Sequence, residues 1–474
     1  MARIVLVEPP APGYHVFSFS NLPRLGLPSL GTVLRDRGHE VKIFCPDLAP
    51  LPPSELLQAD LVGLSTTTST APAAYRLGDF CRAHGVPVLM GGVHASFRPQ
   101  EALRHADYVL RGEAEEVVGD AVDRILARSP LPGSPEADGD GEAPDLPELC
   151  RVRDLDALPV PDLSLIQGWR PTAVTPIQTS RGCPHDCSFC SVTTMFGHRY
   201  RFRSTGLVLE EIAQRRPRCI FFYDDNFAAY PARTKELLEG MLRLPHPPRW
   251  AGQVRADCVE DPELLDLMQA SHCERLFIGY ESASPATLQT YNKQESVEQI
   301  LTSLRLLHER RIPVHGMFVL GADSDDVPGI RETVNFTVRQ GVDTVQFSVL
   351  TPFPGTRQFR AFEQAQRIFE RDWSRYDGGH VVFEPRHMSA ATLQRETSRA
   401  YHRFYSLARA IKHGLARRYA ELAIGLYAQR ILLLMRWRDR GFFRRLRRQG
   451  RAPAGALPSD YQVSVRKGTA GRPA

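Results

Sequence analysis

Short apolar runs alternate with helical patterns along the first 128 residues. The runs are rich in leucine and β-branched residues and too short for helices, which is typical of strands buried on both faces. They cover residues 3–10, 40–47, 60–68, 86–92 and 108–113. Helical patterns such as LGTVLRDRG and YRLGDFCRAHG lie between them, each closed by a glycine that suits a helix C-cap. This alternation predicts a doubly wound, parallel, Rossmann-like α/β domain over residues 1–128.

A second alternating array predicts a partial (β/α)6 barrel over residues 151–355. Within it, Asp261 followed by Pro262 is typical of a helix N-cap with proline in the first turn. Residues 356–450 have mainly helical periodicity and predict a helical C-terminal region. The apolar runs of the barrel cover residues 175–180, 219–225, 251–257, 275–282, 313–321 and 344–352.

Composition adds limits to this picture. Residues 129–150 are rich in Pro, Gly, Asp and Glu and predict a flexible linker, and residues 451–474 predict a disordered tail. A net charge of +5 is too small to indicate a nucleic-acid partner. The N-terminus lacks the apolar core of a signal peptide, and no apolar run is long enough for a membrane-spanning helix. The odd count of nine cysteines favours reduced thiols and a cytoplasmic location.

Three of these cysteines follow the first strand of the predicted barrel. Cys183, Cys187 and Cys190 lie in SRGCPHDCSFCSV, with the spacing Cys-x3-Cys-x2-Cys. Structural zinc usually needs four ligands in two pairs, and His198 is a conceivable fourth ligand. A redox disulfide more often uses Cys-x-x-Cys alone. An iron–sulfur cluster fits better, because three thiolates leave one iron of a four-iron cubane open to bind a small molecule.

The motif CPHDCSFC after the first strand of a partial barrel resembles the radical S-adenosylmethionine superfamily. The resemblance implies a [4Fe–4S] cluster on the three cysteines, with S-adenosylmethionine bound to the open iron. One-electron cleavage of its sulfonium bond gives methionine and a 5′-deoxyadenosyl radical, which abstracts hydrogen from the substrate. An external electron donor of the flavodoxin or ferredoxin type is implied as well.

Five further residues match positions that bind S-adenosylmethionine in that superfamily. Phe189 matches an aromatic residue near the adenine. Asp224 and Asp225 end the second strand, where an acid holds the methionine ammonium group; adjacent acids point to opposite faces, so we expect one to bind and the other to cap a helix. Arg255 and Glu281 resemble residues that bind the carboxylate and the ribose, with a surface ion pair as the alternative.

The N-terminal half resembles the cobalamin-binding domain of cobalamin-dependent radical S-adenosylmethionine enzymes. The matching segments include GLSTTT, MGGVHASFRPQEAL and ADYVLRGEAEE. The Asp-x-His-x-x-Gly motif that ligates cobalt in other classes is absent, so either cobalamin binds without a protein ligand or the domain is a relic. His15 and His39 are available to cobalt, as is His94, but nothing supports them as ligands. The resemblance implies that the nucleotide tail of cobalamin is lined by Ser65, Thr66, Thr67, Gly91, Gly92 and His94.

The leading functional hypothesis is methyl transfer to an unactivated carbon through methylcobalamin. The alternatives are oxidative cyclisation or ring rearrangement with the same cofactors, as in anaerobic cyclases, and a non-catalytic cluster-binding protein. Residues 431–449 interleave Leu, Trp and Phe with arginines. This pattern predicts either peripheral contact with an anionic membrane, which would suit a lipid-like substrate, or a helix packed on the barrel with its arginines in solvent.

Overall fold

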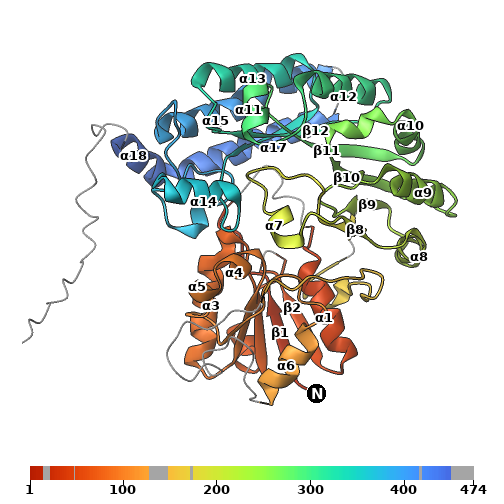
Figure 1. The fold of residues 1–474 in the computed structure, drawn as a ribbon, viewed down its shortest axis with the longest axis vertical. Coiled ribbons are helices and arrows are strands. Elements are labelled where there is room, and N and C mark those ends of the chain that lie inside the picture. Colours follow the sequence, from red (N-terminus) through yellow and green to blue (C-terminus); the bar gives the residue numbers. More distant parts are fainter. Residues whose placement is uncertain (14–21, 47, 128–147, 171–173, 416–418, 450–474) are drawn as a thin grey trace, which may run out of the picture.

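The computed structural model describes residues 1–13, 22–46, 48–127, 148–170, 174–415 and 419–449. Figure 1 shows an N-terminal α/β domain, in red to orange, packed against a larger domain in yellow to blue. The predicted linker and tail fall almost entirely outside the described residues. Within the described residues, no helix combines the length and the apolar character needed to cross a membrane.

The N-terminal domain is a five-stranded parallel sheet with the order β2-β1-β3-β4-β5. Alternate residues of β1 enter different cores: Ile4 and Leu6 pack under α1 and α6, whereas Val5 and Val7 pack under α2 and α3. Burial on both faces explains why this strand is apolar throughout. The strands are β1 (Arg3–Val7), β2 (Glu40–Phe44), β3 (Leu61–Ser65), β4 (Val88–Gly91) and β5 (Tyr108–Val109), and the helices are α1 (Gly26–Asp36), α2 (Pro53–Leu57), α3 (Ala71–Ala83), α4 (Val93–Phe97), α5 (Pro99–Ala102) and α6 (Val118–Leu126).

The second domain contains a six-stranded parallel sheet with the order β13-β12-β11-β10-β9-β6, so the barrel is open between β13 and β6. The predicted N-cap is confirmed, because the Asp261 side chain accepts from the Leu264 amide at 3.0 Å. The strands are β6 (Thr175–Ile177), β9 (Cys219–Phe222), β10 (Arg249–Val254), β11 (Cys273–Glu281), β12 (Val314–Leu320) and β13 (Thr344–Val349). The helices are α8 (Thr205–Arg215), α9 (Pro231–Leu242), α10 (Pro262–Ala270), α11 (Pro285–Thr290), α12 (Val297–Glu309) and α13 (Val327–Arg339).

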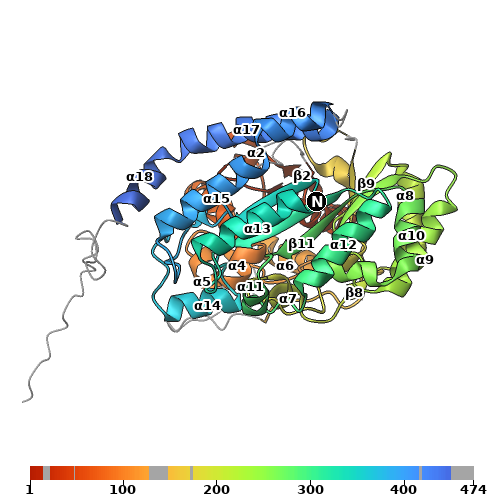
Figure 2. The same cartoon turned by 90° about the horizontal axis from the view of Figure 1, so that it is seen from above.

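The C-terminal region is helical, as predicted. Helix α15 packs on α13 and on the edge strand β13, and α17 packs on α15. Figure 2 shows α16, α17 and α18 as a long arm along one side of the molecule. The helices of this region are α14 (Arg357–Gln364), α15 (Ala390–Phe404), α16 (Leu407–Leu415), α17 (Tyr419–Arg438) and α18 (Arg440–Gln449).

The first predicted barrel strand, residues 175–180, is interrupted in the structure. Strand β6 ends at Ile177, and β7 (Ser180–Arg181) then pairs with β8 (Arg201–Phe202) in a separate antiparallel hairpin. The cause is local, because the Asp224 carboxylate accepts the Thr179 and Ser180 amides at 2.7 and 3.0 Å. Those amides are therefore not available to continue the parallel ladder.

Buried charges join the two domains. Arg181 of β7 places one guanidinium nitrogen 2.8 Å from Glu113 and another 2.7 Å from Glu115, and both acids belong to the N-terminal domain. Arg201 of β8 adds a second contact to Glu113 at 2.8 Å. All four side chains are at least nine-tenths buried. Separating a buried ion pair leaves each charge buried without a partner, which costs free energy. These contacts therefore fix the orientation of β7 against the N-terminal domain.

Candidate functional site

The cysteine loop begins directly after this hairpin strand. Gly182 has φ +89°, and a Cβ at this position would come within 2.8 Å of the Arg199 carbonyl oxygen. A residue with a side chain would therefore be both strained and crowded here. The glycine lets the chain turn away from β7 so that Cys183 leaves the hairpin toward the carboxyl ends of the barrel strands, and the loop ends at α7 (Val192–Phe196).

Two neighbouring segments hold the cysteine loop in place. The Asp186 carbonyl accepts from the Asn292 side chain at 2.7 Å and from Arg357 at 2.6 Å. The Ser188 amide donates to the Tyr291 carbonyl at 3.0 Å. The loop therefore takes its shape from contacts to residues more than 100 positions away in sequence, which supports a rigid platform for a bound group.

The three thiols have the chemistry that a cluster requires. Cys183, Cys187 and Cys190 are free thiols, and each is partly accessible. Burial, together with the charges of Cys187, Asp225 and Cys183, raises the pKa of Cys190 to about 12. Burial also raises the pKa of Cys183 and of Cys187, and the positive charges of Arg255 and Lys293 oppose this rise. Within the described chain, no three His, Cys, Asp or Glu side chains are arranged to hold a single metal ion.

The two adjacent acids take different roles. Asp224 is fully engaged by the chain, because it accepts two amides and the Thr179 hydroxyl, the last at 2.5 Å. The sequence pattern predicted that one of the two acids caps a helix. Asp224 does not, because its carboxylate is bonded to Thr179 and Ser180. Asp225 is partly accessible. Burial, together with the charge of Asp224, raises the pKa of Asp225 to about 7. Asp225 is thus the acid that remains able to bind an ammonium group.

Arg255 and Glu281 are brought together in a buried charge cluster. Arg255 lies 3.0 Å from Glu295 and 3.1 Å from Asp257. Lys293 lies 3.5 Å from Glu281 and 3.8 Å from Glu295, and it links the two predicted residues. The Arg255 and Glu281 side chains are at least nine-tenths buried, so the surface ion pair considered as the alternative is not what the structure shows. Burial raises the pKa of Glu281, and Lys293 opposes that rise.

Sequence reasoning missed Lys293 and Glu295. Both follow α11 in the segment YNKQES, where Asn292 and Gln294 have φ of +53° and +55°. Left-handed residues on either side of a lysine turn the chain back toward β11 and place the Lys293 ammonium among buried acids. Phe189 also contacts this segment, with its ring edge-on to Tyr291 at 5.0 Å between centroids. The sequence signal was weak, since four charged or amide residues before a helix cap usually indicate an exposed turn.

The predicted cobalamin residues lie at the carboxyl ends of β3 and β4. Ser65 ends β3, and Thr67 follows two residues later; both are partly accessible, whereas Thr66 is buried. Gly92 has φ +92°, and a Cβ there would come within 2.5 Å of the Thr66 carbonyl oxygen. Gly91 ends β4 and is also partly accessible. These small residues leave an open edge where a large ligand can approach the backbone.

The three histidines considered for cobalt occupy unlike positions. His94 is fully buried, with Nε2 3.0 Å from the Tyr75 hydroxyl and the ring edge-on to Trp373. Its side chain is therefore not presented at the open edge. His39 precedes β2, at the opposite end of the sheet, and its Nε2 lies 3.5 Å from Asp123. His15 lies outside the described residues.

The open edge of the N-terminal sheet and the carboxyl ends of the barrel strands face each other. Tyr223, which follows β9, packs on the N-terminal core. A second contact lies near the end of β13, where Gly355 has φ +89° and a Cβ would come within 2.5 Å of the Phe97 ring of α4. Trp373 donates to Glu101 of α5 at 2.6 Å. These contacts keep the candidate cobalamin edge and the cysteine loop facing each other across the interface.

Comparisons with known proteins agree with this organisation. The family model for the B12 binding domain matches residues 18–122, and that for the radical SAM superfamily matches residues 177–336. A bacteriochlorophyllide d C-12(1)-methyltransferase from Chlorobaculum tepidum is 31% identical over 355 residues, covering 72% of this chain and 74% of that protein. An anaerobic magnesium-protoporphyrin IX monomethyl ester cyclase from Cereibacter sphaeroides is 28% identical over 397 residues, covering 77% of this chain and 63% of that protein.

A solved structure shares the whole arrangement. The cobalamin-dependent S-adenosylmethionine radical enzyme OxsB, with aqua-cobalamin bound, superposes with a TM-score of 0.66. The superposition covers 93% of this chain and 75% of that chain at 16% identity, so it establishes the fold. Both predicted α/β domains and their order along the chain are thereby confirmed.

The adjacent acids give a paired prediction. Asp224→Asn replaces an acceptor of three hydrogen bonds with a group that presents N–H to buried donors, so we expect thermal unfolding to show a loss of about 1–3 kcal/mol. Asp225→Asn should change stability by less than about 0.5 kcal/mol. In the cluster-loaded protein it should weaken S-adenosylmethionine binding at least roughly tenfold, because a charge-assisted contact is lost. The reverse pattern would contradict the assignment of the two acids.

Proposed function

Because this chain belongs to the radical S-adenosylmethionine enzymes that carry a B12-binding domain, we propose that it is a cobalamin-dependent methyltransferase acting on an unactivated carbon. One observation carries the proposal: the cysteine loop of the barrel domain faces the edge of the N-terminal sheet where β3 and β4 end in small residues. A substrate held between them would reach groups bound at both edges. The methyltransferase of Chlorobaculum tepidum supports this activity by its likeness to the chain.

The residues of the chain divide the work of holding the cofactors. Cys183, Cys187 and Cys190 would hold the [4Fe–4S] cluster, which supplies the electron that cleaves S-adenosylmethionine. Phe189 and the buried charges would receive the cosubstrate: Asp225 its ammonium group, Arg255 its carboxylate and Glu281 its ribose. Ser65, Thr66 and Thr67, with Gly91 and Gly92, would line cobalamin through backbone and small side chains, and His94 would support them from inside the domain.

Two further partners follow from this function. The cluster must be reduced from outside, so the chain requires a one-electron donor such as a flavodoxin or ferredoxin. The substrate is a small or lipid-like molecule. Oxidative cyclisation with the same cofactors is the second candidate function, favoured by the 28% identity to a cyclase over 397 residues.

Deuterium labelling separates the two candidates. The reconstituted protein is incubated anaerobically with reductant, methyl-d3 S-adenosylmethionine and a small-molecule and lipid extract, and products are found by mass spectrometry. We expect one product to gain a methyl group that carries three deuterium atoms, and Cys190→Ala to abolish it. A product that loses hydrogen and gains no deuterium would contradict methyl transfer and indicate cyclisation.

Membrane contact through the C-terminal arm is also part of the proposal. Helix α16 exposes Leu407, Ile411 and Leu415 at helical spacing, with exposed fractions of 61%, 62% and 82%. On α17, Leu433 and Trp437 are exposed by 63% and 68%. The packed alternative accounts for other residues of the arm, namely Ile431, Leu432, Phe442 and Leu446, which are buried. Leu433 and Trp437 lie in the last turns of α17, directly before the arginines of α18, and apolar side chains next to arginines suit an anionic lipid surface.

Vesicle binding tests this contact. We expect the protein to sediment with phosphatidylglycerol vesicles and much less with phosphatidylcholine vesicles, because the arginines add electrostatic attraction. Leu433→Gln combined with Trp437→Gln should weaken the binding at least roughly tenfold, since each side chain loses about 1.5–3 kcal/mol of apolar burial. Leu207→Gln, at an exposed site on α8, is the matched control. Equal sedimentation of the double variant and the control would refute the contact.

A further inference from the structure

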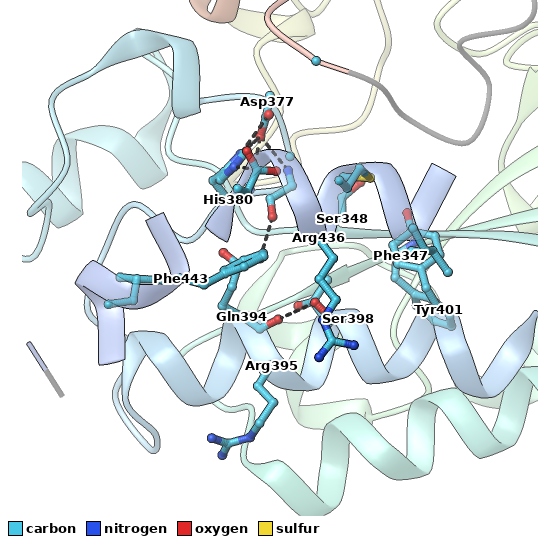
Figure 3. Close-up of a pocket in the computed structure, with 18 of the residues that line it drawn as sticks. Phe347, Ser348, Asp377, His380, Gln394, Arg395, Ser398, Tyr401, Arg436 and Phe443 are labelled. Atoms are coloured by element: carbon cyan, nitrogen blue, oxygen red, sulfur yellow. Dashed lines mark hydrogen bonds and ion pairs between the residues drawn. The ribbon is translucent and has the colours of Figure 1, made fainter. Parts of the chain in front are cut away.

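A cavity of about 640 Å³ lies where the barrel is open, beside its edge strand β13. Its walls come from both domains: Gly13 and Arg24 from the N-terminal domain, β13, the loop that holds Asp377 and His380, and the helices α15, α17 and α18. Figure 3 shows α15 and α17 on two sides of it. The volume falls in the range of small-molecule sites, and the cavity shares no residue with the cysteine loop.

The cavity reaches from the outer helices to the inner face of the barrel. Phe347 of β13 points outward, because its ring contacts Tyr401 of α15 edge-on at 5.6 Å. Successive side chains on a strand point to opposite faces, so Gln346 and Ser348 lie on the inner face. All four residues line the cavity. A ligand placed here would therefore extend around the edge of β13 toward the side where the two candidate cofactor edges meet.

The acids in the lining are already neutralised. Asp377 lies 2.9 Å from Nδ1 of the buried His380. Asp439, at the junction of α17 and α18, lies 2.8 Å from Arg438 and 3.2 Å from Arg375. Nε2 of His380 lies 3.4 Å from Asp439, so the imidazole bridges the two carboxylates. These ion pairs neutralise the negative charge of Asp377 and Asp439. They also hold the junction of α17 and α18 against the loop that carries His380.

Some of the arginines that line the cavity have an acidic partner in the described chain, and others do not. Arg399 is paired with Glu396 at 2.6 Å, and Arg24 with Glu8 at 3.2 Å. Arg436 and Arg447 also line the cavity, and neither has an acidic partner in the part of the chain that the structure describes. Figure 3 shows Arg436 extending from α17 toward Ser398 on α15. The cavity therefore carries positive charge that only a ligand or solvent would offset.

Apolar side chains complete the wall. Tyr401, Met435, Phe443 and Leu446 line the same space as the arginines. We propose that this cavity binds the substrate of the methyl transfer, and that the substrate is an amphipathic organic anion, with a carboxylate or phosphate on a large apolar body. The identification of the ligand as substrate rests on the proposed function. A guanidinium pairs with either anion through two parallel hydrogen bonds, and the apolar wall takes the body of the molecule.

Two fluorescent probes with the same rings test the site in the full chain. 8-Anilinonaphthalene-1-sulfonate carries an anionic group, and N-phenyl-1-naphthylamine lacks it. We expect tighter binding of the sulfonate at one site per chain. Arg436→Gln should weaken that binding about tenfold, the value of one charge-assisted contact, and change the neutral probe less than about twofold. Arg440→Gln, at an exposed arginine outside the cavity, is the control and should change neither.

A second variant locates the probe. Ser398→Trp fills the cavity from α15 and should displace both probes, with circular dichroism and the melting temperature confirming that the chain still folds. Equal affinity for the two probes would overturn the proposal. So would equal losses of sulfonate binding in Arg436→Gln and Arg440→Gln, or sulfonate binding that survives in Ser398→Trp.

Formation of 5′-deoxyadenosine separates this proposal from the function on which it rests. The reconstituted parent and the Arg440→Gln control should both cleave S-adenosylmethionine, because Arg440 lies outside the cavity and outside the cysteine loop. Normal cleavage with no probe preference overturns the cavity proposal alone. Absence of cleavage in the parent overturns the proposed function and with it the identification of the ligand as substrate, even where the probes bind as expected.

Discussion

The buried contact of Arg181 with Glu113 and Glu115 is the interaction on which the rest of the site depends. The arginine ends β7, and the first cysteine of the loop follows only two residues later. One side chain therefore sets both the docking of the N-terminal domain and the starting point of the cysteine loop. Charges buried to this degree tolerate little displacement, because separation leaves each of them without solvent or a partner.

Asp224 extends this constraint into the barrel. By accepting the Thr179 and Ser180 amides, it ends β6 and frees the next residues to form the hairpin that carries Arg181. It also leaves Asp225 as the acid that remains accessible. The charges around Arg255 and Lys293 then lie on the barrel side of the three thiols, and the edge formed by β3 and β4 lies across the interface. The cavity beside β13 opens at the border of these parts.

Both α/β domains, their order and the helical C-terminal region could be predicted from periodicity, because buried parallel strands and their covering helices leave clear patterns. The cysteine motif was equally readable, since its spacing is local. Lys293 and Glu295 could not be found in this way, because their burial depends on left-handed residues in a turn that looks exposed. The different roles of Asp224 and Asp225 were predicted only in part. The sequence indicated that one of the two acids binds the cosubstrate. It did not indicate the role of the other, because Asp224 bonds to Thr179, which lies 45 residues earlier in the chain.

The central claim is that the interface holds a cluster and cobalamin close enough to act on one substrate. The most direct test is pulsed electron paramagnetic resonance on anaerobically reconstituted protein, reduced so that the cluster and cob(II)alamin each carry an unpaired electron. The account predicts measurable dipolar coupling between these two electrons in each chain. Protein that contains both cofactors by iron and cobalt analysis but shows no coupling would contradict it.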